Sequence, residues 1–142
     1  MNNEFFNIES FDKVAGKYYS NYDDDKCKLL FFQEIESQLS KKVIVPLNSK
    51  NKINDGWDFK VYHDGEPGPI ILILHAVFSS EEELEKFGDV PFVEYTDLLT
   101  VLEYCRDLEV DLSFDPFREE TGRLFIDYDS IEDFFVYLST IK

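Results

Sequence analysis

The segment HAVFSSEEELEKFG, residues 75–88, joins the end of an apolar run to a short acidic stretch. Ser80 stands three residues before Glu83, which is the spacing of a capping box at the start of a helix. The three consecutive glutamates fill the first turn, where the helix dipole stabilises negative charge. Gly88 suits the end of a helix because glycine adopts positive φ readily. The segment therefore predicts a strand followed by a helix over residues 80–87, and it gives the glutamates a structural role rather than a catalytic one.

The apolar run itself, IILILHAVF at residues 70–78, is continuous and rich in β-branched residues. Such a run predicts a strand buried on both faces, and we interpret His75 within it as a core or rim residue. Upstream, KKVIVPLN at 41–48 indicates a short strand ending at Pro46, and WDFKVYH at 57–63 alternates apolar and polar residues like a half-buried strand. We expect these upstream segments to form two antiparallel strands joined by a turn.

The remaining segments alternate between helical and extended patterns. Amphipathic spacing predicts further helices over residues 11–22, 23–39, 97–108 and 130–141. Apolar–polar alternation predicts further strands over residues 91–96, 110–116 and 123–129. Thr96 or Asp97 is expected to cap the third of these helices, and Ser130 with Asp133 forms a second capping box. Helices and strands are mixed along 142 residues, which predicts a single α+β domain with a mixed, mostly antiparallel sheet and helices packed on it.

The charge of the chain is strongly negative and unevenly distributed. The formal net charge is −16 at pH 7. Residues 1–78 carry 12 acidic residues against 9 lysines, a net of −3, whereas residues 79–142 carry 18 against 5 lysines and arginines, a net of −13. A field of this sign repels nucleic acid and anionic membranes and attracts a basic partner. The same acidity also fits a protein that uses charge only to stay soluble.

Motifs that carry catalytic chemistry are missing from the sequence. It contains no GxSxG elbow, no P-loop and no GxGxxG. Its two histidines and two cysteines lack the paired spacing of a zinc site. We interpret Cys27 and Cys105 as reduced thiols of a cytoplasmic protein, although the sequence alone leaves a disulfide between them open. DYDSIED at 127–133 lacks the glycine and terminal glutamate of an EF-hand loop, so its acids read as strand-face residues and a helix cap. We expect no enzyme activity, no cofactor and no metal.

Several of these segments resemble the SseB-like family, named for a bacterial serine-sensitivity enhancer. The likeness rests on HAVFSSEEELEKFG (75–88), FVEYTDLLTVL (92–102), VDLSFDPFREETGRLF (110–125) and FFQEIESQLSKKVIVPLN (31–48), and it spans about residues 27–137. Asp115 and Pro116 stand where the family usually has Asn-Pro. His75 stands where the family often has proline, and the first hairpin carries an inserted SKNKINDGW.

The resemblance implies an α+β fold and a protein-binding role rather than a reaction. Family members are linked to accessory functions in type III secretion, and domains of this kind occur beside secreted toxins as immunity proteins. We expect an intracellular, cytoplasmic immunity protein that neutralises a toxin by stoichiometric binding, with a basic toxin domain such as a nuclease as partner, and no direct contact with nucleic acid or membrane. The alternatives are a regulatory or accessory protein of a secretion or stress pathway, and a DNA mimic.

The contact surface is predicted from the acidic second half of the chain. Alternating strands would present carboxylates on an open face, and one phenylalanine in the turn would supply an apolar anchor. The candidate partner-binding residues are Asp111, Asp115, Phe117, Glu119, Glu120, Asp127 and Asp129.

Overall fold

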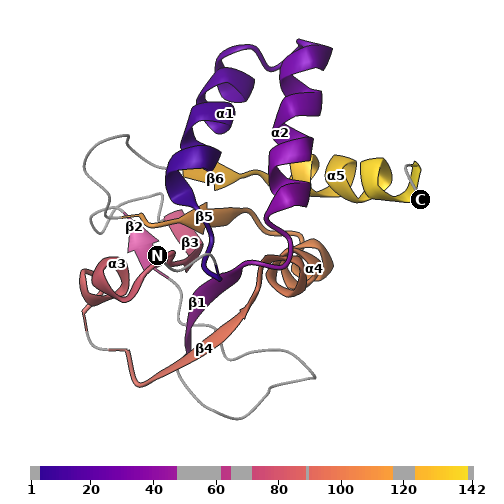
Figure 1. Ribbon diagram of the computed structural model, residues 1–142. Helices are drawn as coiled ribbons and strands as arrows, with labels where there is room; N and C mark the ends of the chain where they lie inside the picture. The colour runs from indigo at the N-terminus through magenta and orange to yellow at the C-terminus, as the bar shows by residue number, and fades with distance from the viewer. Residues whose placement is uncertain (1–3, 48–61, 65–71, 89, 117–123, 141–142) are drawn as a thin grey trace.

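A computed structural model describes residues 4–47, 62–64, 72–88, 90–116 and 124–140. The helices are α1 (Ile8–Ser20), α2 (Asp25–Ser37), α3 (Glu81–Glu85), α4 (Leu98–Leu108) and α5 (Tyr128–Thr140). The strands are β1 (Lys42–Leu47), β2 (Tyr62–Asp64), β3 (Leu72–Val77), β4 (Phe92–Asp97), β5 (Leu112–Phe114) and β6 (Leu124–Ile126). Figure 1 shows these elements interleaved along the chain, which confirms the α+β class.

The strands form two connected groups. Four of them lie in the order β2-β3-β5-β6, in which β3 and β5 are parallel and the other two pairs are antiparallel. The other two, β1 and β4, pair antiparallel. Ile44 of β1 joins the groups, since its backbone N–H donates to the carbonyl of Phe78 at 2.8 Å and its carbonyl accepts from the Phe78 N–H at 3.0 Å. The end of the apolar run therefore lies inside the structure, with Ala76, Val77 and Phe78 fully buried.

The predicted pairing of segments 41–48 and 57–63 is wrong for the part that the structure describes. β1 pairs with β4, in a register that runs from Lys42 opposite Asp97 to Leu47 opposite Phe92. β2 pairs instead with β3. Both edges of β1 are used, one by β4 and the other by Phe78 at the end of the buried run. Sequence proximity favoured a hairpin here, but burial of β1 between two distant segments determined the pairing.

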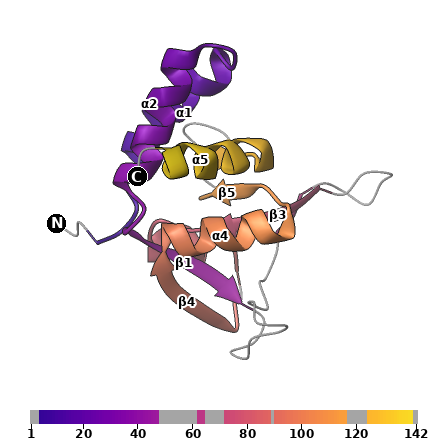
Figure 2. The same ribbon diagram turned by 90° about the vertical axis from the view of Figure 1, so that its right-hand side faces the viewer.

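α1 and α2 form a helical hairpin that projects from the strands (Figures 1 and 2). Aromatic side chains hold its two helices together and attach them to the sheet. The ring of Tyr18 in α1 stacks on Phe31 in α2, with centroids 4.3 Å apart. Phe11 lies 5.7 Å from Phe31 and 4.9 Å from Phe114 of β5, and Phe6 stacks on Phe114 at 4.8 Å. Aromatic pairs at these separations contribute beyond their area of burial, and they attach the hairpin to the sheet.

The predicted caps of α3 and α4 are confirmed. The Ser80 hydroxyl accepts from the Glu83 N–H at 3.2 Å, and Asp97 accepts from the Thr100 N–H at 2.8 Å. Gly88 has φ 100°, as a residue that ends a helical segment needs. The return half of the capping box is not made: Oε2 of Glu83 binds Lys86 at 2.9 Å, and the buried Oε1 has no hydrogen-bond partner among the described residues. α3 is also shorter than predicted and buries none of its residues completely.

α5 begins earlier than predicted, and Ser130 is not its cap. Ser130 is fully buried in the first turn, and its hydroxyl donates to Asp127 at 2.6 Å and lies 2.8 Å from the Tyr18 hydroxyl. Asp133 is exposed and pairs with Lys28 at 3.0 Å. A buried contact with α1 therefore decided where the helix begins. α5 lies beside α4 (Figure 2), and the guanidinium of Arg106 stands 4.1 Å from the ring centre of Phe135.

Candidate functional site

Two of the predicted contact residues lie in an exposed acidic group where α4 ends and α5 begins. We name this group the acidic edge and define it as Glu109, Asp111, Asp129 and Glu132, all of which are exposed. Asp111 accepts from the backbone N–H of Tyr128 at 2.7 Å, so it caps the first turn of α5 as well as adding charge. Two members of the group are thus placed by bonds to Tyr128 at the start of α5: Asp111 accepts its backbone N–H, and Glu109 lies within reach of its hydroxyl.

Tyr128 lies at the centre of the acidic edge. Its hydroxyl makes a long contact of 3.4 Å with Glu109. Partial burial of the ring, followed by the neighbouring carboxylates of Glu132 and Glu109, raises the pKa of Tyr128 to about 12. Negative charge opposes loss of the phenolic proton. The two carboxylates therefore add to a shift whose largest cause is burial.

An exposed leucine adjoins these carboxylates. Leu108 is the last residue of α4 and is 49% exposed, and Glu109 follows it with a left-handed backbone at φ 59°. An apolar side chain next to exposed charge is the composition of a contact patch with a hydrophobic centre and a polar rim. Sequence reasoning missed Leu108 because helical periodicity assigns it no special place. It also missed Glu109, because no glycine marks the helix end.

Asp115 is placed differently from the prediction. It is fully buried, and its carboxylate accepts the backbone N–H of Ser79 at 2.8 Å and the Ser79 hydroxyl at 2.5 Å. Its backbone is left-handed, with φ 43°, a conformation that aspartate and asparagine tolerate better than most residues. Ser113, assigned to the same polar strand face, is 2% exposed. We therefore leave Asp115 out of the acidic edge, because a fully buried carboxylate cannot contact a partner without rearrangement.

Asp127 also points inward. It accepts from the hydroxyls of Tyr19 at 2.8 Å and Ser130 at 2.6 Å, and its N–H donates to the Tyr19 oxygen at 3.1 Å. Tyr22 makes a further contact of 3.4 Å. These bonds join α1 to the start of α5, so Asp127 is half-buried and serves the packing of two helices. The other predicted contact residues, Phe117, Glu119 and Glu120, lie outside the described residues.

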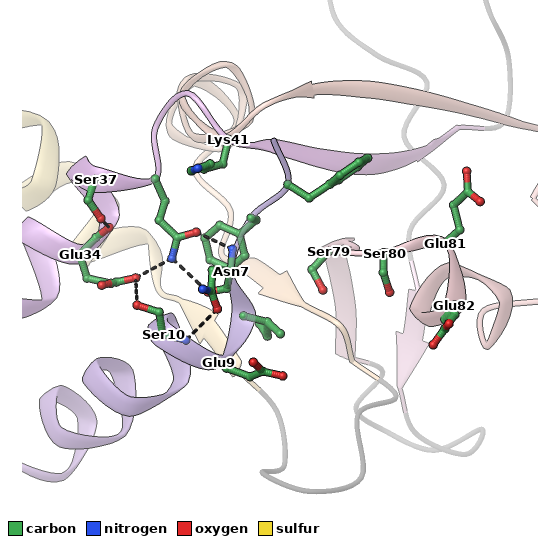
Figure 3. Close-up of a pocket in the computed structure, with 14 residues that line it drawn as sticks. Asn7, Glu9, Ser10, Glu34, Ser37, Lys41, Ser79, Ser80, Glu81 and Glu82 are labelled. Atoms are coloured by element: carbon green, nitrogen blue, oxygen red, sulfur yellow. Dashed lines mark hydrogen bonds between the residues drawn. The ribbon is translucent and has the colours of Figure 1, made fainter. Parts of the chain in front are cut away.

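A separate cleft of about 870 Å³ opens between three segments that are distant in sequence. Its walls are the chain before and at the start of α1, the end of α2, and the turn from β3 into α3 (Figure 3). Among the described lining residues, four carboxylates stand against one lysine. They are Glu9, Glu34, Glu81, Glu82 and Lys41. Phe5, whose ring packs on Tyr95 with centroids 5.9 Å apart, also lines the cleft.

One wall of the cleft is held by a buried glutamine. Gln38 is 4% exposed, and its amide accepts from the Asn7 N–H at 2.6 Å, donates to the Asn7 carbonyl at 3.0 Å and donates to Oε2 of Glu34 at 2.5 Å. The Ser10 hydroxyl donates to the same Glu34 oxygen at 2.8 Å (Figure 3). Oε2 of Glu34 is thus fixed by two donors, whereas Oε1 accepts no hydrogen bond from the described residues.

The opposite wall contains the serines of the opening segment. The Ser79 hydroxyl is turned to Asp115, and the Ser80 hydroxyl caps α3. Beside them, Glu81 accepts from the Tyr95 hydroxyl at 2.6 Å, and that bond is the main cause that raises the pKa of Tyr95. The two walls therefore carry carboxylates at positions fixed by hydrogen bonds with the protein itself.

Within the described ranges, no group of three histidine, cysteine or acidic side chains is arranged to hold a metal ion. Both cysteines are free thiols. Cys105 is buried, and this burial, with a smaller contribution from the charge of Asp111, raises its pKa to about 12. A thiol with so high a pKa is a poor nucleophile near neutral pH. Cys105 is thus a core residue, as the helical spacing predicts.

Comparison with known proteins gives no family assignment. No family model, curated protein or solved structure matches this chain. The likeness to the SseB-like family thus rests on the quoted motifs alone. In the part of the chain that the structure describes, no helix has both the length and the apolar character needed to cross a membrane.

Proposed function

We propose that this chain is a non-enzymatic, intracellular immunity protein of the SseB-like type that neutralises a basic toxin domain by one-to-one binding. The observation that carries the proposal is the acidic edge, where Glu109, Asp111 and Glu132 interact with Tyr128, the exposed Asp129 follows it in the chain, and the exposed Leu108 precedes Glu109. A surface of this composition suits a positively charged cleft, such as that of a nuclease, because opposite potentials speed encounter and orient the partners.

The mechanism is occlusion. Carboxylates of the acidic edge would pair with lysines and arginines of the partner, while Leu108 loses its exposed surface at the centre of the contact. Charges at the rim of an interface contribute mainly to the rate of association, and buried apolar contacts contribute mainly to the lifetime of the complex. The partner is inhibited because its substrate and this chain compete for the same positive surface.

The proposal is tested by capture from the native cell followed by titration of the captured protein's activity. We expect a basic protein whose toxic activity falls to zero at one equivalent of this chain. The double variant Asp129→Lys and Glu132→Lys should fail to neutralise it at the same concentration.

The matched control reverses two charges elsewhere, at Asp23 and Glu85. Both side chains are exposed, and neither forms a hydrogen bond or ion pair with another described residue. The control variant should retain one-to-one neutralisation. A captured partner whose activity is unaffected by this chain would contradict the immunity role and favour a regulatory one.

A further inference from the structure

We propose that the cleft behind Ser79 and Ser80 is a binding site for a guanidinium or alkylammonium group, supplied by an arginine or lysine side chain of a protein partner. This site is distinct from the acidic edge, and it goes beyond the function proposed above. The cleft combines a volume of about 870 Å³, fixed carboxylates on two walls and an aromatic ring.

The volume is suited to a side chain rather than to a single ion. A cleft of this size exceeds what one water or metal ion fills, and it falls in the range of sites that take organic groups. Its three walls come from distant segments and are joined by core contacts, among them the stacking of Phe6 on Phe114 and the burial of Gln38. The shape of the cleft is therefore set by the packing of the core and does not depend on a single loop.

The charge of the lining selects a cation. Four carboxylates and one lysine among the described lining residues leave a net charge of −3. Two of the carboxylates, Glu9 and Glu82, are exposed and form no hydrogen bond or ion pair with another described residue. A cation entering between them would replace water at both groups with charge-assisted hydrogen bonds, which are the strong kind.

The arrangement of Glu34 favours a planar, multiply donating cation. Its Oε2 is immobilised by Ser10 and Gln38, so the direction of its second oxygen is fixed before any ligand arrives. Preorganised acceptors lose little entropy on binding. Phe5 adds a ring of the kind on which guanidinium groups stack, and arginine pairs with carboxylates in a fork geometry. The cleft thus favours arginine over lysine.

A direct test uses small peptides, so it does not need the toxin. The probe is acetyl-Gly-Arg-Gly-amide, whose guanidinium is its single charge, titrated into labelled protein and followed by amide chemical shifts. We expect saturable shifts at residues 7–10 and 79–82, with a Kd on the order of 1 mM for so small a ligand. The citrulline peptide, which has the same shape without the charge, should leave these amides unshifted.

Variants distinguish specific binding in the cleft from the general attraction of a cation to an acidic protein. The double variant Glu9→Gln and Glu82→Gln should weaken binding of the arginine peptide about tenfold, equivalent to about 1.4 kcal/mol. The matched pair Asp23→Asn and Glu103→Gln removes the same charge from exposed positions outside both the cleft and the acidic edge and should change Kd less than twofold. Phe5→Leu should weaken the arginine peptide more than the corresponding lysine peptide.

Three outcomes would overturn the proposal. Equal shifts with the citrulline peptide would show that charge is not recognised, and equal loss in the control pair would show counterion attraction without a site. Saturable binding of spermidine with none of the arginine peptide would assign the cleft to free polyamines instead of protein side chains. None of these outcomes depends on the acidic edge. A negative result with the arginine peptide would therefore not contradict the proposed function, and a failure of toxin neutralisation would not contradict binding in the cleft.

Discussion

The carboxylate of Asp115 accepts both the backbone N–H and the hydroxyl of Ser79, 36 residues earlier in the chain. The bond pair joins the residue after β5 to the turn that follows β3, and the N–H of Asp115 returns a bond to the Val77 carbonyl at 3.0 Å. The two serines that end the apolar run thus have different partners. Ser79 secures the parallel pair of strands, and Ser80 begins the helix.

Replacement of Asp115 by alanine is expected to destabilise the fold by about 2–4 kcal/mol. The variant leaves the Ser79 donors without their acceptor, and it places alanine in a left-handed conformation that aspartate tolerates better. Asp115→Asn keeps an acceptor oxygen and suits that backbone, so it should lose less. Urea denaturation measures both. Equal stability of the alanine variant and the wild type would contradict a structural role for Asp115.

Replacement of Ser80 by alanine is expected to cost about 0.5–1 kcal/mol, at the lower end of the range for a lost N-cap. α3 has five residues and none is fully buried, so few tertiary contacts depend on it. Neutralisation of a partner through the acidic edge should be unchanged in this variant. Unchanged stability with a large loss of binding would instead make the α3 turn a contact surface.

The stability of the fold should decline at alkaline pH because of its buried tyrosines. Burial is the largest cause that raises the pKa of Tyr18 and Tyr19 far above the usual value of 10.0. A group with a raised folded pKa stabilises the fold fully below its unfolded pKa and loses that contribution as pH rises above it. The unfolding free energy should thus begin to fall near pH 9, where the thiol of Cys105 would ionise in the unfolded chain, and should fall more steeply above about pH 10 as the tyrosines add to the loss.

The matched variant for this titration is Tyr19→Phe, which removes one phenol and keeps the ring. Its stability at pH 8 should be lower, because Asp127 loses the Tyr19 hydroxyl as donor and acceptor. Its decline with pH above 10 should be shallower than that of the wild type. An identical slope in the two proteins would mean that Tyr19 does not titrate on unfolding in this range.

Charge reversal of Asp129 and Glu132 should slow association with a basic partner more than it speeds dissociation. Exposed charges act over about 8–10 Å at physiological ionic strength, so they guide encounter and are screened by salt. The association rate should therefore fall as salt rises, with a smaller slope in the variant. Stopped-flow or surface-binding kinetics at several salt concentrations measure this. An association rate that changes neither with salt concentration nor on charge reversal would exclude electrostatic capture.

Truncation of Leu108 to alanine should have the opposite kinetic signature. Leu108 is 49% exposed in the free protein, so its loss should change the stability of the fold by less than about 1 kcal/mol. If Leu108 is buried by the partner, dissociation should become about tenfold faster while association stays nearly constant. Val136, which is 61% exposed on α5, provides the control, since Val136→Ala should leave both rates unchanged.

The sequence predicted those features that depend on a few neighbouring residues. The caps at Ser80 and Asp97 are of this kind, because side chain and backbone donor are three residues apart. The inward bonds of Asp115 were not predictable in the same way, since alternation along β5 marks only which residues share a face. The parallel pairing with β3 then buried the face that carries the polar residues.

The predicted start of α5 was wrong for a related reason. Asp127 and Ser130 both suit a helix cap, and local spacing with Asp133 favoured Ser130. The helix begins where it does because two tyrosines of α1, more than 100 residues earlier, bind these two residues: Tyr18 binds Ser130, and Tyr19 binds Asp127. The cleft was equally beyond sequence reasoning, because its walls are three segments that meet only after the core has formed.

The contact between Tyr18 and Ser130 spans 112 residues of chain, and it has a consequence for how the protein is made. On the ribosome, α1 and α2 emerge before the strands and helices that follow them, and they carry Phe11, Tyr18 and Phe31, which stack on one another. Their remaining partners, Phe114 of β5 and the first turn of α5, are among the later residues to be synthesised. Contacts of such long range form slowly and late. The aromatic helical hairpin therefore stays uncovered until β5 and the start of α5 have been translated, and during this interval it is a target for chaperones.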